Sequence, residues 1–412
     1  MKVLQLCHKP PFPPIDGGCK AMNNISRGFI NNNVDLKILS IHTHKHPFNA
    51  NNIPKEYHRD TGIESIYVDT KLNVVDALSN LITQDSYNIS RFFSPDFDLK
   101  LIEVLEENSF DVIHLESLFM TPYMGTIRRL TNAPIVLRSH NLEFVIWERM
   151  AHAAANKAKK TYLKVLASQL KKYEKQVLKE IDAIVSITHE DTQRFKKLGC
   201  KKPVITIPFG IDFNHYNPDL SKTQENTVFH LGAMDWLPNI EGLDWFLEQV
   251  WPKIFSHNPD LSFHIAGKNM PKNYITDLNN GLVIEGEVES AREFINSKSI
   301  MVVPLLSAGG MRVKIIEGMA MGKIIVSTSV GAEGIDYENK KHLFIADSPK
   351  EFTQVINKLM ANPELVQSVG NNARELIQEK YDNNKLSADL IRFYEELIRE
   401  NIKQKRLVNK SS

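Results

Sequence analysis

Two cations stand beside the predicted start of a helix in the second half of the chain. Arg312 and Lys314 follow Gly309 and Gly310, and helical periodicity covers 311–321. The free N–H groups at a helix start, which glycines allow a ligand to approach closely, form a site for an anion. Cations in the same place oppose the helix dipole unless an anion lies between them. The spacing therefore predicts that this segment binds a phosphate group.

Glu317 lies three residues after Lys314, so a helix places both side chains on one face. Its carboxylate could accept hydrogen bonds from the two hydroxyls of a ribose. It could equally form an ion pair with Lys314. The spacing alone leaves both interpretations open.

A second glycine pair stands near the N-terminus. Gly17 and Gly18 follow the first apolar run, 2–7, and lie at the start of a helical pattern over 19–33. Bare backbone N–H groups at that helix start would suit a phosphate or an acceptor group. Glycine pairs also mark ordinary tight turns, and the sequence alone does not separate the two interpretations.

Polar residues end two further apolar runs of the first half. His140 follows the run 134–138, which ends at Arg138, and Glu116 follows the run 111–115. Ligands of open parallel sheets bind at the carboxyl ends of the strands. We therefore expect His140 to contact substrate, and Glu116 and Arg138 to contact an acceptor. The alternative for a single histidine is a structural role.

Short apolar, β-branched runs alternate with longer helical patterns, which is typical of parallel α/β architecture. The first series has strands at 2–7, 35–41, 63–68, 111–115, 134–138, 183–187 and 204–207, and helices at 19–33, 72–83, 97–108, 119–131, 141–180 and 190–198. The second has strands at 227–231, 261–266, 282–285, 300–304, 323–328 and 343–346, and helices at 239–256, 289–297, 311–321, 349–361 and 363–379.

The two series predict two Rossmann-like domains. A chain of 412 residues exceeds a single hydrophobic core, and periodicity is interrupted between 208 and 226. We expect an N-terminal, acceptor-side domain over 1–208 and a donor-binding domain over 209–383, facing a cleft that holds the active site. A C-terminal helix and basic tail, 384–412, would pack back across the linker.

Composition excludes several classes of protein. The net charge is +1, which lacks the field of a nucleic-acid-binding protein. The three cysteines lack the spacing of a disulfide framework or a zinc site, and a reducing cytoplasm fits them. No apolar run is long enough to span a membrane, so any membrane contact would be peripheral.

The segment from Gly309 to Glu317 resembles the donor-binding segment of the retaining glycosyltransferases of family 4, also called group 1, which have the two-domain GT-B fold. Members carry Glu-x7-Glu with Arg or Lys between. Glu317 matches the second glutamate, which in the family binds ribose. Gly309 stands where the family has a glutamate that contacts the transferred sugar. A family variant reading Gly-Gly-x-Arg-x-Lys-x-x-Glu is similar, and it implies sugar recognition by backbone N–H groups at Gly309 and Gly310.

The stretch that begins Phe229-His-Leu-Gly-Ala resembles the first strand and loop of the family's second domain. Many members have an arginine and a lysine there as phosphate ligands, whereas this chain has Met234, Asp235 and Asn239. The resemblance then implies that the diphosphate charge is met mainly by Arg312 and Lys314. Trp236 could line the cleft, and Trp245 and Trp251 are expected in the core.

The resemblance also implies donor contacts elsewhere. His140 matches a histidine that touches the donor sugar, and Gly17 and Gly18 would contact the donor. The backbone at Val288, in the loop Gly286-Glu-Val-Glu, would contact the nucleotide base. No metal and no other cofactor is expected.

Two surface patterns have alternative interpretations. His42, His44 and His46 alternate like a metal-ligand set, but Lys45 is an unfavourable neighbour and we favour solvated surface. Residues 151–180 are rich in lysine, which suits contact with anionic lipid or a lipid-diphosphate acceptor, or a simply solvated helix face.

Together these features predict a metal-independent, retaining enzyme that moves a hexose-type sugar from a UDP- or GDP-sugar to a hydroxyl of a glycan or lipid-linked acceptor. Its context would be surface-polysaccharide or glycolipid assembly in the cytoplasm, with peripheral contact to the inner membrane face. One alternative is a degenerate GT-B protein that acts as a nucleotide-sugar-binding scaffold, suggested by Gly309. The other is a hydrolysing nucleotide-sugar epimerase, which would need more acid–base residues than the sequence offers.

Overall fold

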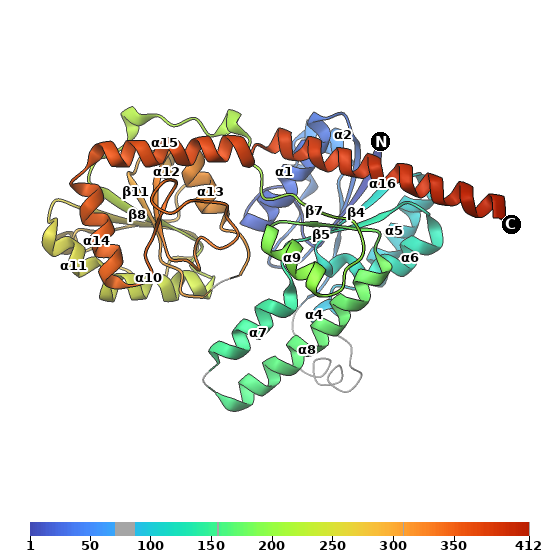
Figure 1. The fold of residues 1–412 in the computed structure, drawn as a ribbon, viewed down its shortest axis with the longest axis horizontal. Coiled ribbons are helices and arrows are strands. Elements are labelled where there is room, and N and C mark those ends of the chain that lie inside the picture. The colour runs from blue at the N-terminus through green and yellow to red at the C-terminus, as the bar shows by residue number, and fades with distance from the viewer. Residues whose placement is uncertain (71–86, 155, 308, 412) are drawn as a thin grey trace. The chain divides into compact units, whose positions relative to one another are not determined.

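The structure, a computed structural model, describes residues 1–70, 87–154, 156–307 and 309–411. The chain divides into two compact units. Unit 1 comprises Met1–Gly210 together with Asn383–Ser412, and unit 2 comprises Ile211–Asp382. Each unit is a parallel sheet with helices around it (Figure 1), so the predicted α/β class with two Rossmann-like sheets is confirmed.

Unit 1 contains a seven-stranded sheet in the order β3-β2-β1-β4-β5-β6-β7. Its strands are β1 (Lys2–Cys7), β2 (Asp35–His42), β3 (Glu64–Tyr67), β4 (Val112–Glu116), β5 (Ile135–Ser139), β6 (Ala183–Ser186) and β7 (Val204–Thr206). Its helices are α1 (Gly17–Asn31), α2 (Lys55–Thr61), α4 (Tyr87–Ser90), α5 (Pro95–Glu107), α6 (Met124–Leu130), α7 (Glu143–Ala153), α8 (Lys157–Glu180), α9 (His189–Lys197) and α16 (Asn383–Ser411).

Unit 2 contains a six-stranded sheet in the order β10-β9-β8-β11-β12-β13. Its strands are β8 (Thr227–Leu231), β9 (Ser262–Ala266), β10 (Leu282–Gly286), β11 (Ile300–Val303), β12 (Ile324–Ser327) and β13 (Phe344–Ile345). Its helices are α10 (Leu237–Gln249), α11 (Trp251–His257), α12 (Ala291–Asn296), α13 (Val313–Ala320), α14 (Pro349–Met360) and α15 (Pro363–Lys380).

Three predicted helices are divided in the structure. The helix expected over 141–180 is an α7–α8 hairpin that extends from unit 1 (Figure 1), because Asn156 caps a new helix by accepting from the N–H groups of Ala158 and Lys159. The segment 119–131 is a 3-10 turn followed by α6, with Pro122 inside the turn. The segment 239–256 breaks at Val250, before α11. The helix expected over 72–83 lies outside the described residues.

The last helix completes the hydrophobic core of unit 1. Leu386, Leu390, Tyr394 and Leu397 of α16 are buried in the same apolar cluster as Val3 of β1, and α16 packs along α1 (Figure 1). Among the described residues, no helix combines the length and the low charge needed to cross a bilayer.

The close packing of α1 on α16 makes Gly28 sensitive to substitution. A Cβ atom at Gly28 would lie 1.8 Å from Ser387 Oγ, so Gly28→Ala should lower the free energy of unfolding by about 1–3 kcal/mol. Gly125 on α6 has no neighbour within 4 Å of such an atom, and Gly125→Ala should be neutral or stabilising by about 0.5–1 kcal/mol. Urea unfolding of both variants measures this difference, and equal effects would contradict the packing.

Candidate functional site

The phosphate-binding segment predicted in unit 2 lies where the strand order of the sheet reverses. Strand β8 lies between β9 and β11, and such a switch point is where open parallel sheets bind their ligands. Lys314, in the first turn of α13, donates from Nζ to the carbonyl oxygen of Leu231, the last residue of β8, at 2.9 Å. The cation therefore lies at the carboxyl edge of the sheet.

Asn239 holds Lys314 in this place. Lys314 Nζ also donates to Asn239 Oδ1 at 3.0 Å, and Asn239 Nδ2 donates to the carbonyl of Ala233 at 2.8 Å. Burial and the nearby Arg312 guanidinium lower the pKa of Lys314 to about 7. Asn239 is thus a positioning residue for the cation.

Arg312 is the residue that precedes α13, and it is 7% exposed. Its guanidinium donates to the carbonyls of Gly309 and Gly310 and lies 5.5 Å from the centre of the Trp236 ring. Gly310 has a φ of +76°, which favours glycine at this position. The loop and Trp236 thus hold the guanidinium near Lys314.

Glu317 is buried on α13 and accepts a hydrogen bond from the Tyr216 hydroxyl at 2.7 Å. Burial and then the Glu317 charge raise the pKa of Tyr216. The Lys314 ammonium is directed to Leu231 and Asn239, so the alternative of a Lys314–Glu317 ion pair is not what the structure contains. Sequence reasoning missed Tyr216, because no local pattern marks it.

The other residues expected in unit 2 occupy different surroundings. Val288 is half-buried in the loop after β10. Trp251 is buried at 3% exposure, and Trp245 packs half-buried against the core, as expected, whereas Trp236 is 37% exposed.

In unit 1 the strand order reverses at β1, which lies between β2 and β4. Glu116 ends β4 and is fully buried. Its Oε1 accepts from Gln5 Nε2 at 2.9 Å, and its Oε2 accepts from Arg138 Nη1 at 3.0 Å and from His140 Nε2 at 2.7 Å. Burial alone would raise the pKa of Glu116, but Arg138 and the imidazoles hold it well below its usual range. Glu116 is therefore a buried carboxylate.

A second histidine joins this carboxylate to the C-terminal helix. His114 Nε2 lies 3.0 Å from Glu116 Oε1, and His114 Nδ1 is hydrogen-bonded to the hydroxyl of Tyr394 on α16. Both side chains are fully buried. Sequence reasoning missed His114 and Tyr394, because a pattern in one strand does not reveal a partner 280 residues away.

The burial of Glu116 and Arg138 corrects our expectation that they contact an acceptor. Arg138 is 1% exposed and its guanidinium faces Glu116. Neither side chain offers a surface to a ligand, and both hold His140. The His140 side chain is 16% exposed at the carboxyl end of β5, and burial lowers its pKa even though Glu116 opposes that shift.

The glycine pair of unit 1 begins α1, where Asp16 caps the helix by accepting from Cys19 N at 2.8 Å. Lys9 Nζ lies 2.8 Å from each Asp16 carboxylate oxygen. A Cβ atom on Gly18 would lie 2.7 Å from Lys9 Nζ. The absence of a side chain at Gly18 therefore leaves space for the Lys9 ammonium.

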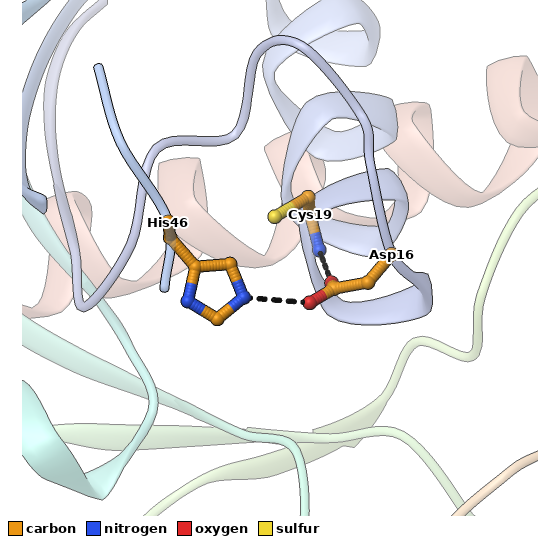
Figure 2. Close-up of side chains that lie close together, drawn as sticks. All are labelled: Asp16, Cys19 and His46. Carbon is orange, nitrogen blue, oxygen red and sulfur yellow. Dashed lines mark hydrogen bonds and ion pairs between the residues drawn. The ribbon is translucent and has the colours of Figure 1, made fainter. Parts of the chain in front are cut away.

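The three alternating histidines do not lie together on one strand face. His42 ends β2 beside Ser65, His44 is exposed, and His46 Nε2 lies 2.9 Å from Asp16 Oδ2. We expected His46 to be solvated surface, but it is instead part of a cluster with Asp16 and Cys19 (Figure 2).

These three residues are of ligating types, but two features oppose a metal ion at this cluster. The Lys9 ammonium contacts both Asp16 oxygens, and burial raises the pKa of the Cys19 thiol to about 12, so the thiolate that binds metals is disfavoured. We assign no metal to this cluster.

Two carboxyl groups lie beside each other just beyond His140. Glu174 Oε1 accepts from the backbone N–H of Glu143 at 2.7 Å, and so caps α7. Burial raises the pKa of Glu143 to about 7, and burial together with Glu143 raises the pKa of Glu174 well above its usual range. Sequence reasoning missed both residues, because helical spacing does not indicate that they meet.

The two parallel sheets, each surrounded by helices, have the fold of solved GT-B glycosyltransferases. Sucrose-phosphate synthase from Thermosynechococcus elongatus superposes with a TM-score of 0.73 at 14% identity, over 97% of this chain and 100% of that chain. Anabaena HepE in complex with UDP gives 0.63 at 13% identity over 96% and 100%. The pneumococcal O-GlcNAc transferase GtfA in complex with UDP and GlcNAc gives 0.66 at 12% identity over 97% and 99%.

Family models identify the chain more closely. The model "Glycosyltransferase Family 4" matches residues 80–215, and the model "Glycosyl transferases group 1" matches residues 225–362. The protein therefore belongs to the family 4, group 1 glycosyltransferases. An uncharacterized 44.6 kDa protein in the cps region of Klebsiella pneumoniae is 25% identical over 62% of this chain and 67% of its own length. An uncharacterized glycosyltransferase of Methanocaldococcus jannaschii is 28% identical over 32% of this chain and 34% of its own length, so the chain matches about a third of that relative.

The raised pKa of Glu143 makes stability depend on pH. Below the ordinary glutamate pKa, both folded and unfolded chains hold the proton, so the full stability is present. As pH rises toward 7 the unfolded chain loses its proton first, and stability falls. Glu143→Gln should remove this loss and melt at a higher temperature than wild type at pH 8, with a smaller difference at pH 5.

The matched control is Glu148→Gln on the same helix, because the Glu148 side chain is 44% exposed. Thermal unfolding at both pH values measures the two differences. If the difference in melting temperature between Glu143→Gln and wild type becomes smaller as pH rises, the raised pKa of the buried Glu143 carboxyl is contradicted.

Proposed function

We propose that this enzyme transfers a sugar from a nucleoside-diphosphate donor to an acceptor hydroxyl, with retention of configuration and without a divalent metal. The observation that supports it most strongly is the pair of neighbouring cations, Arg312 and Lys314, at the switch point of unit 2. Arg312 contributes to the lowered pKa of Lys314, so an anion bound beside them would relieve their mutual repulsion. A diphosphate has the charge and the size for that role.

The same cations give the site its chemistry. Negative charge grows on the diphosphate as the bond to the sugar breaks, and fixed cations near the phosphates stabilise that charge most in the transition state. Asn239 and the Leu231 carbonyl hold the Lys314 ammonium, and Trp236 supports the Arg312 guanidinium. In this proposal Arg312 and Lys314 do the work that a metal does in other transferases.

Recognition of the donor is divided among several groups. Glu317 is proposed to bind the ribose hydroxyls through the carboxylate that Tyr216 orients. The backbone near Val288 would meet the base. Gly309 and Gly310 would offer N–H groups to the sugar in place of the usual glutamate. His140 and the backbone at the start of α1 would contribute from unit 1.

The proposed substrates are inferred from similar proteins. HepE binds UDP and GtfA binds UDP with GlcNAc, which supports a nucleotide-sugar donor, UDP- or GDP-linked. The Klebsiella relative belongs to a cps region, which supports a glycan or lipid-linked acceptor in surface-polysaccharide assembly. Exposed lysines of α8, among them Lys164, Lys172 and Lys175, are the surface we propose for peripheral contact with anionic lipid.

Removal of the Arg312 guanidinium should slow the chemical step strongly. With UDP- and GDP-sugars and a glycan or lipid-linked acceptor, Arg312→Ala should lower kcat by about 100-fold or more, while Lys350→Ala, at an exposed position on α14, should not. The assay measures nucleotide release with and without acceptor, in the presence and absence of EDTA. Wild-type turnover by Arg312→Ala, or loss of activity with EDTA, would contradict the proposal. Binding without turnover would indicate a scaffold, and isomerisation without acceptor an epimerase.

The lowered pKa of Lys314 should appear as proton uptake on binding UDP. At pH 8 most of the free protein holds neutral Lys314, and a bound diphosphate favours the ammonium form, so affinity should fall as pH rises from 7 to 9. Calorimetry at pH 8 in two buffers of different ionisation enthalpy measures the proton. The variant Lys314→Met should bind more weakly and show no such uptake, and equal uptake in both proteins would assign the proton to another group.

A further inference from the structure

His8 lies at the switch point of unit 1 and has no part in the site described so far. It follows β1 directly, and its Nδ1 lies 3.0 Å from the backbone carbonyl oxygen of Glu116. Its ring is 5.7 Å from the ring of His140, at an interplanar angle of 74°. Two imidazoles therefore stand side by side at the carboxyl ends of β1 and β5.

Glu116 fixes the tautomer of both rings. A carbonyl oxygen only accepts, so His8 carries its proton on Nδ1. The Glu116 carboxylate also only accepts, and it lies nearer to His140 Nε2, at 2.7 Å, than Arg138 Nη1 does, at 3.2 Å, so His140 carries its proton on Nε2. Burial, with Lys9 next, lowers the pKa of His8 to about 3, and burial lowers that of His140 as well. Both rings are neutral near pH 7.

Each ring therefore presents one bare nitrogen lone pair, Nε2 on His8 and Nδ1 on His140. Within the described ranges, neither of these nitrogens has a hydrogen-bond partner in the protein. The positive charges of Lys9 and Arg138 act on these rings, and they oppose a metal ion at the two lone pairs. A neutral ligand with two neighbouring O–H donors satisfies both nitrogens without that repulsion.

We propose that His8 is a second hydroxyl-binding residue, which accepts a hydrogen bond from one hydroxyl of a sugar while His140 accepts one from its neighbour. This inference rests on the proposed function. The sugar is either the transferred sugar of the donor or a sugar of the acceptor, because both carry neighbouring hydroxyls. Glu116 is the positioning residue that selects the free nitrogen of each ring.

Two amide substitutions separate this role from a purely structural one. The longer amide side chain introduced by His8→Gln places an oxygen near the position of Nε2, so it keeps an acceptor for substrate. The shorter amide in His8→Asn can keep the donor near Nδ1 for the Glu116 carbonyl, but it has no acceptor at Nε2. We expect the KM of one substrate to rise about 10-fold in His8→Asn and less than about 3-fold in His8→Gln.

The substrate whose KM rises identifies the source of the hydroxyl: the donor if the transferred sugar binds there, the acceptor otherwise. The matched control is His257→Asn, because His257 also donates from Nδ1 to a carbonyl, that of Lys253, but is exposed on α11. It should leave both KM values unchanged. The reverse order, with His8→Asn nearer to wild type than His8→Gln, would assign His8 a structural role and overturn the proposal.

A spectroscopic measurement tests the inference independently of turnover. In protein labelled with ¹⁵N-histidine, the signals lost in His8→Gln should show a protonated Nδ1 and an unprotonated Nε2 at pH 7. A protonated Nε2 on His8 would overturn the inference and leave the proposed transfer reaction untouched. The expected tautomer together with no sugar transfer from any UDP- or GDP-sugar would instead refute the proposed function.

Discussion

Removing a carboxylate from water costs several kcal/mol unless its lone pairs are engaged by donors or cations, and Glu116 is removed from water completely. Its partners come from several elements: Gln5 from β1, His114 from β4 itself, and Arg138 and His140 from the end of β5. The strands must meet in register for these groups to converge, and β4 pairs with β5 so that Glu116 stands opposite Arg138. One buried charge therefore connects the carboxyl ends of β1, β4 and β5, orients the imidazoles, and reaches Tyr394 of α16 through His114.

Unit 2 uses the opposite arrangement at its own switch point. There the buried charge is positive, and neutral oxygens of Leu231 and Asn239 hold Lys314. Burial and then the neighbouring Arg312 charge lower the pKa of Lys314 to about 7, and no carboxylate among its hydrogen-bond partners in the described part of the chain opposes that shift. The two switch points thus differ in their buried groups: a carboxylate with two neutral imidazoles beside it in unit 1, and a lysine held by neutral oxygens beside an arginine in unit 2.

The alternation of strands and helices could be predicted because it depends on local periodicity. The same holds for the cations before α13, since Arg312, Lys314 and their glycines are close neighbours in the chain. Contacts between distant residues could not be predicted. Tyr216 reaches Glu317 across 101 residues, and Tyr394 reaches His114 across 280. The burial of Glu116 and Arg138 could not be predicted either. Both were placed correctly at strand ends, but the alternation of apolar runs and helical patterns does not show whether a polar side chain at a strand end faces solvent or a buried partner.

Unit 1 is built from two stretches of chain that are separated by the whole of unit 2. During synthesis the ribosome releases all seven strands of the first sheet, and then unit 2, before Asn383–Ser411 emerges. Until then His114 lacks the Tyr394 hydroxyl, and the apolar face that α16 covers has no partner. The first sheet therefore remains incompletely covered while the second unit is being synthesised. A nascent chain of this architecture exposes that apolar face for longer than a domain whose sequence is continuous. During this stage of synthesis the protein is most prone to aggregate or to bind a chaperone.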